Sequence, residues 1–422
     1  MYSKSLPFSQ KQLEDILKIH PTPFYIYDEK GIRDNTRKFL KAFSWNKGFK
    51  EYYAVKANPN PFIIKILHTE GCGTDCSSFP ELIISERLGI SGEEILLTSN
   101  NTSAQDFIKA NELWAIINFD DVSHIDFFEK HCGKMPEIVS FRYNPGKLYK
   151  GNCIIGSPEE SKFGVTKEQV FEGFAKIKSK GIQRFGLHTF IASNVLDFAY
   201  FIAIADMMFN FAIELYEKLN IRLEFIDIGG GIGIPYKQEE QYIDFTIISN
   251  GIKQLYTKKI VPNNLHPLKI FMECGRMITG PYGYLISKVL HLKNTYKKYV
   301  GLDACMANLM RPGIYNAYHH ITVVNKQDQP LEEVYDVTGS ICENMDKFAI
   351  NRKLPKMDVD DIVAIHDVGA HGHSMGFNYN GKLRCEELLL RENGDVVQIR
   401  RAETVDDYLA TIDFKNLEHF KA

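Results

Sequence analysis

The chain has 422 residues, of which 44% are hydrophobic and 24% charged, and its formal net charge at pH 7 is −3. This size and composition are ordinary for a globular protein with a sizeable core, and they allow two domains or one large barrel with an appendage. The small net charge gives no reason to expect nucleic acid or an anionic membrane as partner. No apolar run approaches the length of a membrane span, and the N-terminal MYSKSLPFSQ lacks a signal-peptide core, so a cytoplasmic location is expected.

The cysteines and histidines do not form a recognisable metal pattern. In a chain of this length without a secretion signal, the scattered cysteines are expected to be free thiols. No second pair follows GCGTDC (71–76), and no carboxylate or thiolate lies at a ligand spacing from the histidines of HDVGAHGHSMGFNYN (366–380). The sequence therefore predicts no metal. The eight cysteines lie at positions 72, 76, 132, 153, 274, 305, 342 and 385.

The first two thirds of the chain predict a barrel. A short amphipathic helix is expected at 9–20 and a strand at 22–28 (TPFYIYD). From residue 50 to roughly residue 280, short apolar strands alternate with helical stretches, which is the rhythm of a (β/α)8 barrel. The expected strands are 52–55, 73–76, 95–98, 115–119, 138–143, 185–190, 225–228 and 270–273.

After Gly280 the sequence pattern changes to strand-like runs separated by turns, which predicts an all-β domain. The strand at 22–28 has no helix partner of its own, so it is expected to join that domain. The predicted organisation is a barrel over 30–280, with 1–29 and 281–422 forming a β-sandwich. The runs are YLISKVLHL, KYVGLDA, HHITVV, EEVYDVTGS, DIVAIHDVG, EELLLRENG and DVVQIRR.

The stretch EYYAVKANPNP (51–61) is the first candidate for chemistry. It reads as a short apolar strand that ends in Lys56 and is broken by an Asn-Pro-Asn-Pro turn. In a parallel barrel the active site lies at the carboxyl ends of the strands. Apolar neighbours disfavour the charged form of a lysine and so favour a nucleophilic amine. For this stretch alone, a snorkelling or edge-strand lysine is the alternative.

Two loops suit an anionic, nitrogen-containing ligand. FIDIGGGIGIP (225–235) is a strand followed by glycines, whose backbone N–H groups are able to cradle a phosphate. A dinucleotide is not expected, because Pro235 closes the loop where a helix would have to begin. FMECGRMITG (271–280) places Glu273 at a strand end, where it could hold a proton on a heterocyclic nitrogen. The alternative is a structural pair between Glu273 and Arg276.

Two segments of the predicted β domain add further groups. SICENMD (340–346) sets a thiol beside a carboxylate, which suits proton donation to a carbanion, although a lone cysteine is usually inert packing. MRPGIY (310–315) presents Arg311 before a proline, which suits a bidentate grip on a carboxylate, and a solvated surface arginine is the alternative. Glycines 369, 372 and 376 indicate a loop that approaches a ligand closely.

Taken in order, these motifs resemble the fold type III pyridoxal-phosphate (PLP) decarboxylases, and most closely the meso-diaminopimelate decarboxylases. The likeness runs almost from end to end, and many motifs in family order are more specific than any one of them. The segments that carry it are TPFYIYD, YYAVKAN, GTDCSSFPEL, FRYNPG, SKFGV, GLHTFIASN, DIGGGIGIPY, ECGR, MRPGIYNAYH, CEN.D and GAHGHSMGFNYN.

The resemblance implies roles for individual residues. Lys56 matches the lysine that carries the cofactor, and Glu273 matches the glutamate paired with the protonated pyridine nitrogen, which makes PLP an electron sink. Cys342 and Glu343 match residues that enter the partner subunit's active site, so a homodimer with shared active sites is implied. Cys342 is the candidate proton donor, and Lys56 is the alternative. Asp75, Phe190, Ser193, Gly229, Gly230, Gly231, Gly275, Arg276 and His371 match cofactor-binding positions. Arg276, Arg311, Tyr315, Glu343 and His371 match substrate-binding positions.

Three departures from the family pattern bear on the substrate. Cys274 replaces the proline of EPGR, a change expected to alter loop stiffness alone. Phe190 stands where a histidine stacks on the cofactor ring, and Ala192 replaces the glycine that follows. His371 replaces a tyrosine that touches phosphate and substrate. All three leave the cofactor chemistry intact.

The predicted activity is therefore α-decarboxylation of meso-2,6-diaminopimelate to L-lysine and CO2. Arg276, Arg311 and Glu343 would grip the distal end of this substrate, whereas a decarboxylase for ornithine or lysine would want an acidic group there. The nearest alternatives are a related decarboxylase acting on carboxynorspermidine or on a D- or L-diamino acid. A catalytically inactive PLP-binding paralogue is a further alternative, against which the retention of Lys56, Glu273 and Cys342 argues.

Overall fold

The structure is a computed structural model and describes residues 4–148, 157–191, 193–417 and 419–420. Cys153 and Ala192 lie outside the described residues. The chain divides into two compact units. One is Lys30–Pro281, and the other joins Ser3–Glu29 to Tyr282–Ala422.

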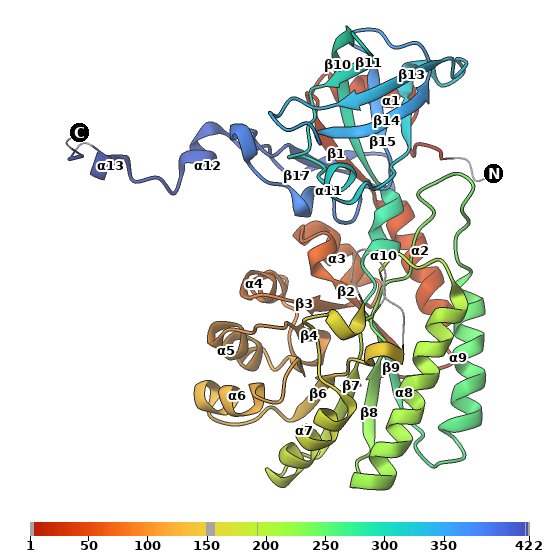
Figure 1. Cartoon of the computed structure of the whole chain (residues 1–422), viewed down its shortest axis with the longest axis vertical. Coiled ribbons are helices and arrows are strands. Elements are labelled where there is room, and N and C mark those ends of the chain that lie inside the picture. Colours follow the sequence, from red (N-terminus) through yellow and green to blue (C-terminus); the bar gives the residue numbers. More distant parts are fainter. Residues whose placement is uncertain (1–3, 149–156, 192, 418, 421–422) are drawn as a thin grey trace. The chain divides into compact units, whose positions relative to one another are not determined.

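The first unit is a closed barrel of eight parallel strands surrounded by helices (Figure 1). This confirms the predicted (β/α)8 barrel, and strand ends differ from the prediction by only a few residues. The last strand pairs with the first, with Glu51 opposite Met272. The strands are β2(Lys50–Ala54), β3(Gly73–Cys76), β4(Ile95–Thr98), β5(Ile116–Phe119), β6(Ile138–Arg142), β7(Arg184–His188), β8(Leu223–Asp227) and β9(Lys269–Met272). The helices are α2(Glu29–Ala42), α3(Pro61–Thr69), α4(Phe79–Arg87), α5(Ala104–Glu112), α6(His124–Cys132), α7(Lys167–Ser179), α8(Phe198–Leu219), α9(Phe245–Lys259) and α10(Arg276–Thr279).

Large apolar side chains fill the interior of the barrel. The rings of Phe225 and Phe271 stack with centroids 4.4 Å apart. Gly186 makes room for them, because a Cβ there would lie 2.0 Å from the Phe225 ring. Burial of each such side chain contributes about 1.5–3 kcal/mol. Because these side chains fill the interior, the barrel is a packed core and not a pore. The cluster consists of Tyr52, Leu96, Ile116, Ile138, Phe225 and Phe271.

Helix α8 corrects one expectation from the sequence. It has 22 residues and contains an 18-residue window with a mean hydropathy of 1.5, so it is long and apolar enough to cross a membrane by length and composition. The sequence analysis missed this length because charged residues punctuate the run. Phe201, Ile204, Met208 and Leu215 are buried along one side of the helix, so packing in the barrel unit accounts for the apolar character of that side.

The second unit is built on a nine-stranded sheet, and its β character agrees with the prediction for the region after Gly280. The early strand β1 pairs antiparallel with β10 and parallel with β16. Strand β14 was not predicted, because exposed polar residues occupy most of its second half. The strands are β1(Phe24–Asp28), β10(Gly283–Asn294), β11(Lys298–Leu302), β12(Ile321–Val323), β13(Glu333–Thr338), β14(Lys347–Leu354), β15(Ile362–Ile365), β16(Glu386–Leu390) and β17(Val396–Arg400).

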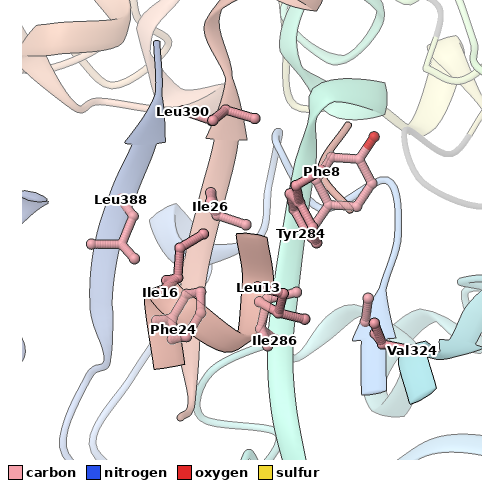
Figure 2. Packing of buried hydrophobic residues seen from close by; sticks show 11 residues of the cluster. Phe8, Leu13, Ile16, Phe24, Ile26, Tyr284, Ile286, Val324, Leu388 and Leu390 are labelled. Carbon is pink, nitrogen blue, oxygen red and sulfur yellow. The ribbon is translucent and has the colours of Figure 1, made fainter. Parts of the chain in front are cut away.

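Helix α1(Gln10–Leu17) covers one face of this sheet (Figure 2). A capping box between Ser9 and Gln12 starts the helix, since each side chain bonds the backbone of the other. Leu13 and Ile16 then pack on the sheet among residues that include Phe24, Ile26, Ile286 and Leu388. The predicted helix at 9–20 is therefore confirmed, but ends three residues earlier.

Candidate active site

Polar side chains close one end of the barrel. Because parallel strands share their carboxyl ends, the residues at those ends meet at one mouth, where barrel enzymes carry their chemistry. Most of these side chains are buried. They are Asp75 on β3, Thr98 on β4, Asn118 on β5, Arg142 on β6, His188 on β7, Asp227 on β8 and Glu273 directly after β9.

Lys56 lies at this mouth. Strand β2 ends at Ala54, and Lys56 sits in the following short turn, Val55–Ala57. Its Nζ is 3.5 Å from Asp75 Oδ2 and 5.5 Å from the centroid of the Phe190 ring. The structure therefore brings together three of the predicted cofactor-binding residues. The Lys56 side chain remains 45% exposed, so its amine is accessible.

The charge environment of Lys56 corrects the expectation of a neutral amine. Burial lowers the pKa of Lys56, but the charges of Asp75, Glu273 and Glu81 outweigh burial and raise it. The prediction was wrong because it considered only apolar neighbours in sequence. Carboxylates that are distant in the sequence, on β3, after β9 and on helix α4, raise the pKa of the amine.

Glu273 is an ionised carboxylate in a buried place. It is 1% exposed, and it accepts a hydrogen bond from Thr98 Oγ1 at 3.1 Å. Its other oxygen lies 3.1 Å from His188 Nε2. Burial raises the pKa of Glu273, but the charge and hydrogen bond of His188, followed by Lys56 and Arg142, bring it down to about 2. The expected alternative partner, Arg276, instead donates to the Tyr236 hydroxyl at 2.5 Å.

The neighbouring carboxyls behave differently. Burial and the charge of Glu273 raise the pKa of Asp75 to about 8, against the opposing effect of Lys56. Burial and Glu273 also raise the pKa of Asp227 well above its usual range. His188, Asp227 and Glu273 offer ligand atoms that all lie within 4.8 Å of one another. The mouth therefore concentrates negative charge on Glu273, where a protonated ring nitrogen would be stabilised.

The glycine loop after β8 is packed so closely that side chains would not fit. Gly229 has a φ of +68°, and a Cβ there would lie 2.4 Å from the Thr189 carbonyl oxygen. A Cβ on Gly230 would lie 2.2 Å from the Glu273 carbonyl oxygen. The loop is therefore held against the loops that follow β7 and β9, and Val195, two residues after Ser193, donates to the Gly231 carbonyl at 3.0 Å. The next helix, α9, begins only at Phe245, which agrees with a phosphate cradle and not with a dinucleotide fingerprint.

Phe190 faces two cations. Its ring centroid lies 5.5 Å from Lys56 Nζ and 5.8 Å from Arg142 Cζ. Arg142 also donates to the Phe190 carbonyl at 3.1 Å and lies 3.6 Å from Asp120. The sequence analysis did not single out Arg142 or His188. Their position at the polar end of an apolar strand, inside FRYNPG and GLHTFIASN, was the available signal.

In the second unit, Arg311 is held and not solvated. It is the first residue of α11(Arg311–Tyr315), and it is 4% exposed. Its guanidinium lies 3.0 Å from His319 Nε2, and His319 Nδ1 lies 2.8 Å from the His366 carbonyl oxygen. The surface-arginine alternative is therefore wrong. Tyr315, at the other end of α11, is exposed.

The SICENMD turn lies against α11, because a Cβ on Gly313 would be 2.6 Å from the Met345 carbonyl oxygen. Asp346 fixes the turn by accepting the N–H groups of Met306 at 2.6 Å and Ile341 at 2.9 Å. Cys342 is a free and exposed thiol, which does not fit the inert-packing alternative. Glu343 is likewise exposed, and His371 adopts a φ of +55° in its glycine-rich loop.

The barrel mouth combines an accessible lysine amine, a buried carboxylate and a closely packed glycine loop. Comparison with known proteins then gives the family. The model described as "Pyridoxal-dependent decarboxylase, pyridoxal binding domain" matches residues 29–280. The chain therefore belongs to the pyridoxal-dependent decarboxylases.

Relatives match along almost the whole chain. Protein TabA of Pseudomonas amygdali pv. tabaci is 41% identical over 97% of this chain and 95% of its own length. The diaminopimelate decarboxylase of Methanothermobacter thermautotrophicus is 36% identical, with 92% and 91% covered. A crystal structure of diaminopimelate decarboxylase from M. jannaschii in complex with L-lysine has a TM-score of 0.87 at 31% identity, with 94% of each chain covered.

The residues at the barrel mouth fit pyridoxal phosphate, the cofactor of this family. Lys56 offers an accessible amine, and ionised Glu273 offers a partner for a protonated pyridine nitrogen. The loop after β8 has no room for a Cβ at Gly229 or Gly230, which accounts for the glycines there. The Gly229 N–H donates to Asp227 Oδ1 at 2.8 Å, which helps to fix the loop. The Phe190 face suits ring stacking but supplies no hydrogen bond.

Proposed function

We propose that the protein converts meso-2,6-diaminopimelate to L-lysine and CO2. The observation that carries the proposal is Arg311, a buried guanidinium oriented by His319. An arginine held in this way suits the second carboxylate of a diamino diacid, whereas a simple diamino acid ends in an amine that an arginine would repel. Relatives named diaminopimelate decarboxylase, at 31–36% identity over most of the chain, support the same substrate.

In this proposal the chain's residues divide the work. Lys56 carries the cofactor, Gly229–Gly231 and Ser193 bind its phosphate, and Glu273 keeps a proton on its ring nitrogen. When bound, pyridoxal phosphate accepts the electron pair released as the bond from Cα to the carboxylate breaks and CO2 leaves. The Cys342 thiol then delivers a proton to Cα.

Arg276, Arg311, Tyr315, Glu343 and His371 bind the substrate in this proposal. The enzyme acts as a homodimer with shared active sites, in which Cys342 and Glu343 of one copy serve the other. Their exposure within a single chain supports that role. A cytoplasmic location, with no membrane or nucleic-acid partner, completes the proposal and rests on the composition of the sequence.

A second candidate is a decarboxylase for carboxynorspermidine or another diamino acid. Phe190 favours it, because a ring without hydrogen-bonding groups stands beside Lys56. His371 favours it as well, since it replaces the tyrosine expected to touch the substrate. Both residues lie where a change would alter the substrate and leave the cofactor chemistry intact.

The test is CO2 release by the purified, PLP-loaded protein. The substrates are meso-diaminopimelate, L-lysine, L-ornithine, L-arginine, D-ornithine, D-lysine and carboxynorspermidine. Release from meso-diaminopimelate with lysine as product supports the proposal. CO2 release from another of these compounds alone would favour the second candidate. If PLP is bound but no compound yields CO2, an inactive paralogue is favoured.

Arg311→Gln sharpens the test. It should raise KM for meso-diaminopimelate by about tenfold or more, because a charge-assisted hydrogen bond is worth about 1.5–3 kcal/mol. Arg401→Gln is the control, since Arg401 is exposed and pairs with Asp407. Equal behaviour of the two variants would contradict the role of Arg311.

A further inference from the structure

Cys274 introduces a buried backbone donor next to Glu273. It takes the place of the proline in the EPGR segment that ECGR resembles, and proline has no N–H group. Cys274 is buried, so its N–H group needs a partner inside the protein. That partner is Glu51, whose Oε1 accepts the N–H at 2.7 Å. The substitution therefore does more than change the stiffness of the loop.

Glu51 binds the loop that contains Cys274, and it makes no ion pair in the part of the chain that the structure describes. It lies on β2, opposite Met272 of β9, and its side chain is 0% exposed. Its second oxygen, Oε2, makes no hydrogen bond. Burial, together with the charges of Glu273 and Asp75, raises the pKa of Glu51 well above its usual range. The raised pKa favours the neutral form of the carboxyl, whose burial costs far less than that of a charge.

The loop that Glu51 holds connects both halves of the cofactor site. Glu273 donates its backbone N–H to the Gly229 carbonyl at 3.0 Å, which joins the loop to the glycine cradle. On the other side, a Cβ on Gly275 would lie 2.6 Å from Ala57 Cβ. Ala57 is the neighbour of Lys56, so the loop packs directly on the lysine turn. A displaced loop would therefore shift Glu273 relative to Lys56.

We propose that Glu51 is a positioning residue: through the Cys274 N–H it holds the loop that carries Glu273 against strand β2, which leads directly into the turn that carries Lys56. The proposal rests on the cofactor role assigned to Glu273 in the proposed function, but it does not depend on the identity of the substrate. Residues that orient a group in contact with a ligand commonly change ligand affinity by tenfold or more.

A double-mutant cycle tests the proposal. Glu51→Leu leaves the Cys274 N–H buried without a partner and should weaken PLP binding about tenfold, measured by equilibrium dialysis of the holoenzyme. Adding Cys274→Pro removes the donor, so the double variant should return to within about twofold of wild type. Glu51→Gln should bind PLP as wild type does, because its amide oxygen accepts the same N–H.

A matched control separates positioning from loss of stability. Asn46 donates to the Leu268 carbonyl at 3.0 Å, at the opposite ends of the same two strands. Asn46→Ala should lower the melting temperature and leave PLP affinity unchanged. The pH midpoint of the bound cofactor's visible absorbance should move in Glu51→Leu and stay in place in Asn46→Ala.

Three results would overturn the proposal. These are wild-type PLP affinity in Glu51→Leu, an equal loss in Asn46→Ala, and failure of Cys274→Pro to restore binding. If Glu51→Leu does not fold, the double variant decides, because it must fold and bind PLP as wild type does. The assay uses no substrate. If the protein binds PLP but does not decarboxylate meso-diaminopimelate, the proposed substrate is wrong, and the PLP-binding test of Glu51 still applies.

Discussion

The strongest electrostatic feature of the barrel mouth can be tested by His188→Leu. His188 is fully buried, and its Nε2 lies 3.1 Å from Glu273. The pKa of Glu273 is about 2, against a usual value of 4.5. That difference corresponds to about 3 kcal/mol, and His188 is the largest cause that favours the ionised form. At pH 7 the variant should therefore lose up to about 3 kcal/mol of unfolding free energy, because Glu273 loses the largest interaction that favours its ionised form and keeps the hydrogen bond from Thr98.

The stability difference between wild type and His188→Leu should depend on pH. A carboxyl whose pKa is depressed by folding contributes stability that is complete above pH 4.5 and is lost as pH falls toward 2. The difference between wild type and His188→Leu should therefore shrink as pH falls below 4.5.

Urea unfolding of the cofactor-free protein between pH 7 and pH 3, followed by tryptophan fluorescence, would measure this difference. Both tryptophans, Trp45 and Trp114, belong to the barrel unit, so the signal reports its unfolding. His124→Leu is the control, because the His124 Nδ1 makes no hydrogen bond and burial already lowers the pKa of this histidine. A stability difference for His188→Leu that stays constant across this pH range would refute the reasoning.

Three further predictions concern the other groups. Lys56→Ala should abolish the visible absorbance of the lysine-bound cofactor. Lys65→Ala is the control, since Lys65 is exposed on α3, and it should keep this absorbance. An unchanged Lys56→Ala spectrum would exclude Lys56 as the cofactor lysine. Cys342→Ala should slow turnover and yield misprotonated products with PLP still bound, as chiral product analysis would reveal, and wild-type behaviour would exclude this thiol as donor. Burial lowers the pKa of His373 to about 4, so between pH 6.5 and pH 4 the unfolded chain binds a proton at this histidine and the folded chain does not. The free energy of unfolding should therefore fall by about 1.4 kcal/mol per pH unit as pH drops through this range. His373→Gln should flatten that slope in acid unfolding followed by circular dichroism, and an unchanged slope would contradict this account.

The sequence by itself determined the elements and most of the candidate site. Apolar strands alternating with amphipathic helices specify a barrel because the pattern depends on local periodicity. Lys56, Glu273 and the glycine loop were identifiable for the same reason, since each follows a strand directly and strand ends meet at one mouth. Strand β14 escaped because exposed polar residues interrupt its pattern.

Only the tertiary structure decided how these groups act on one another. The raised pKa of Lys56 comes from Asp75 on β3, Glu273 after β9 and Glu81 on helix α4. Likewise, the sequence shows a cysteine where a proline is expected, but not that Glu51, more than two hundred residues earlier, accepts its N–H. Charge and hydrogen bonding depend on distance in space, and the closure of β9 onto β2 sets that distance.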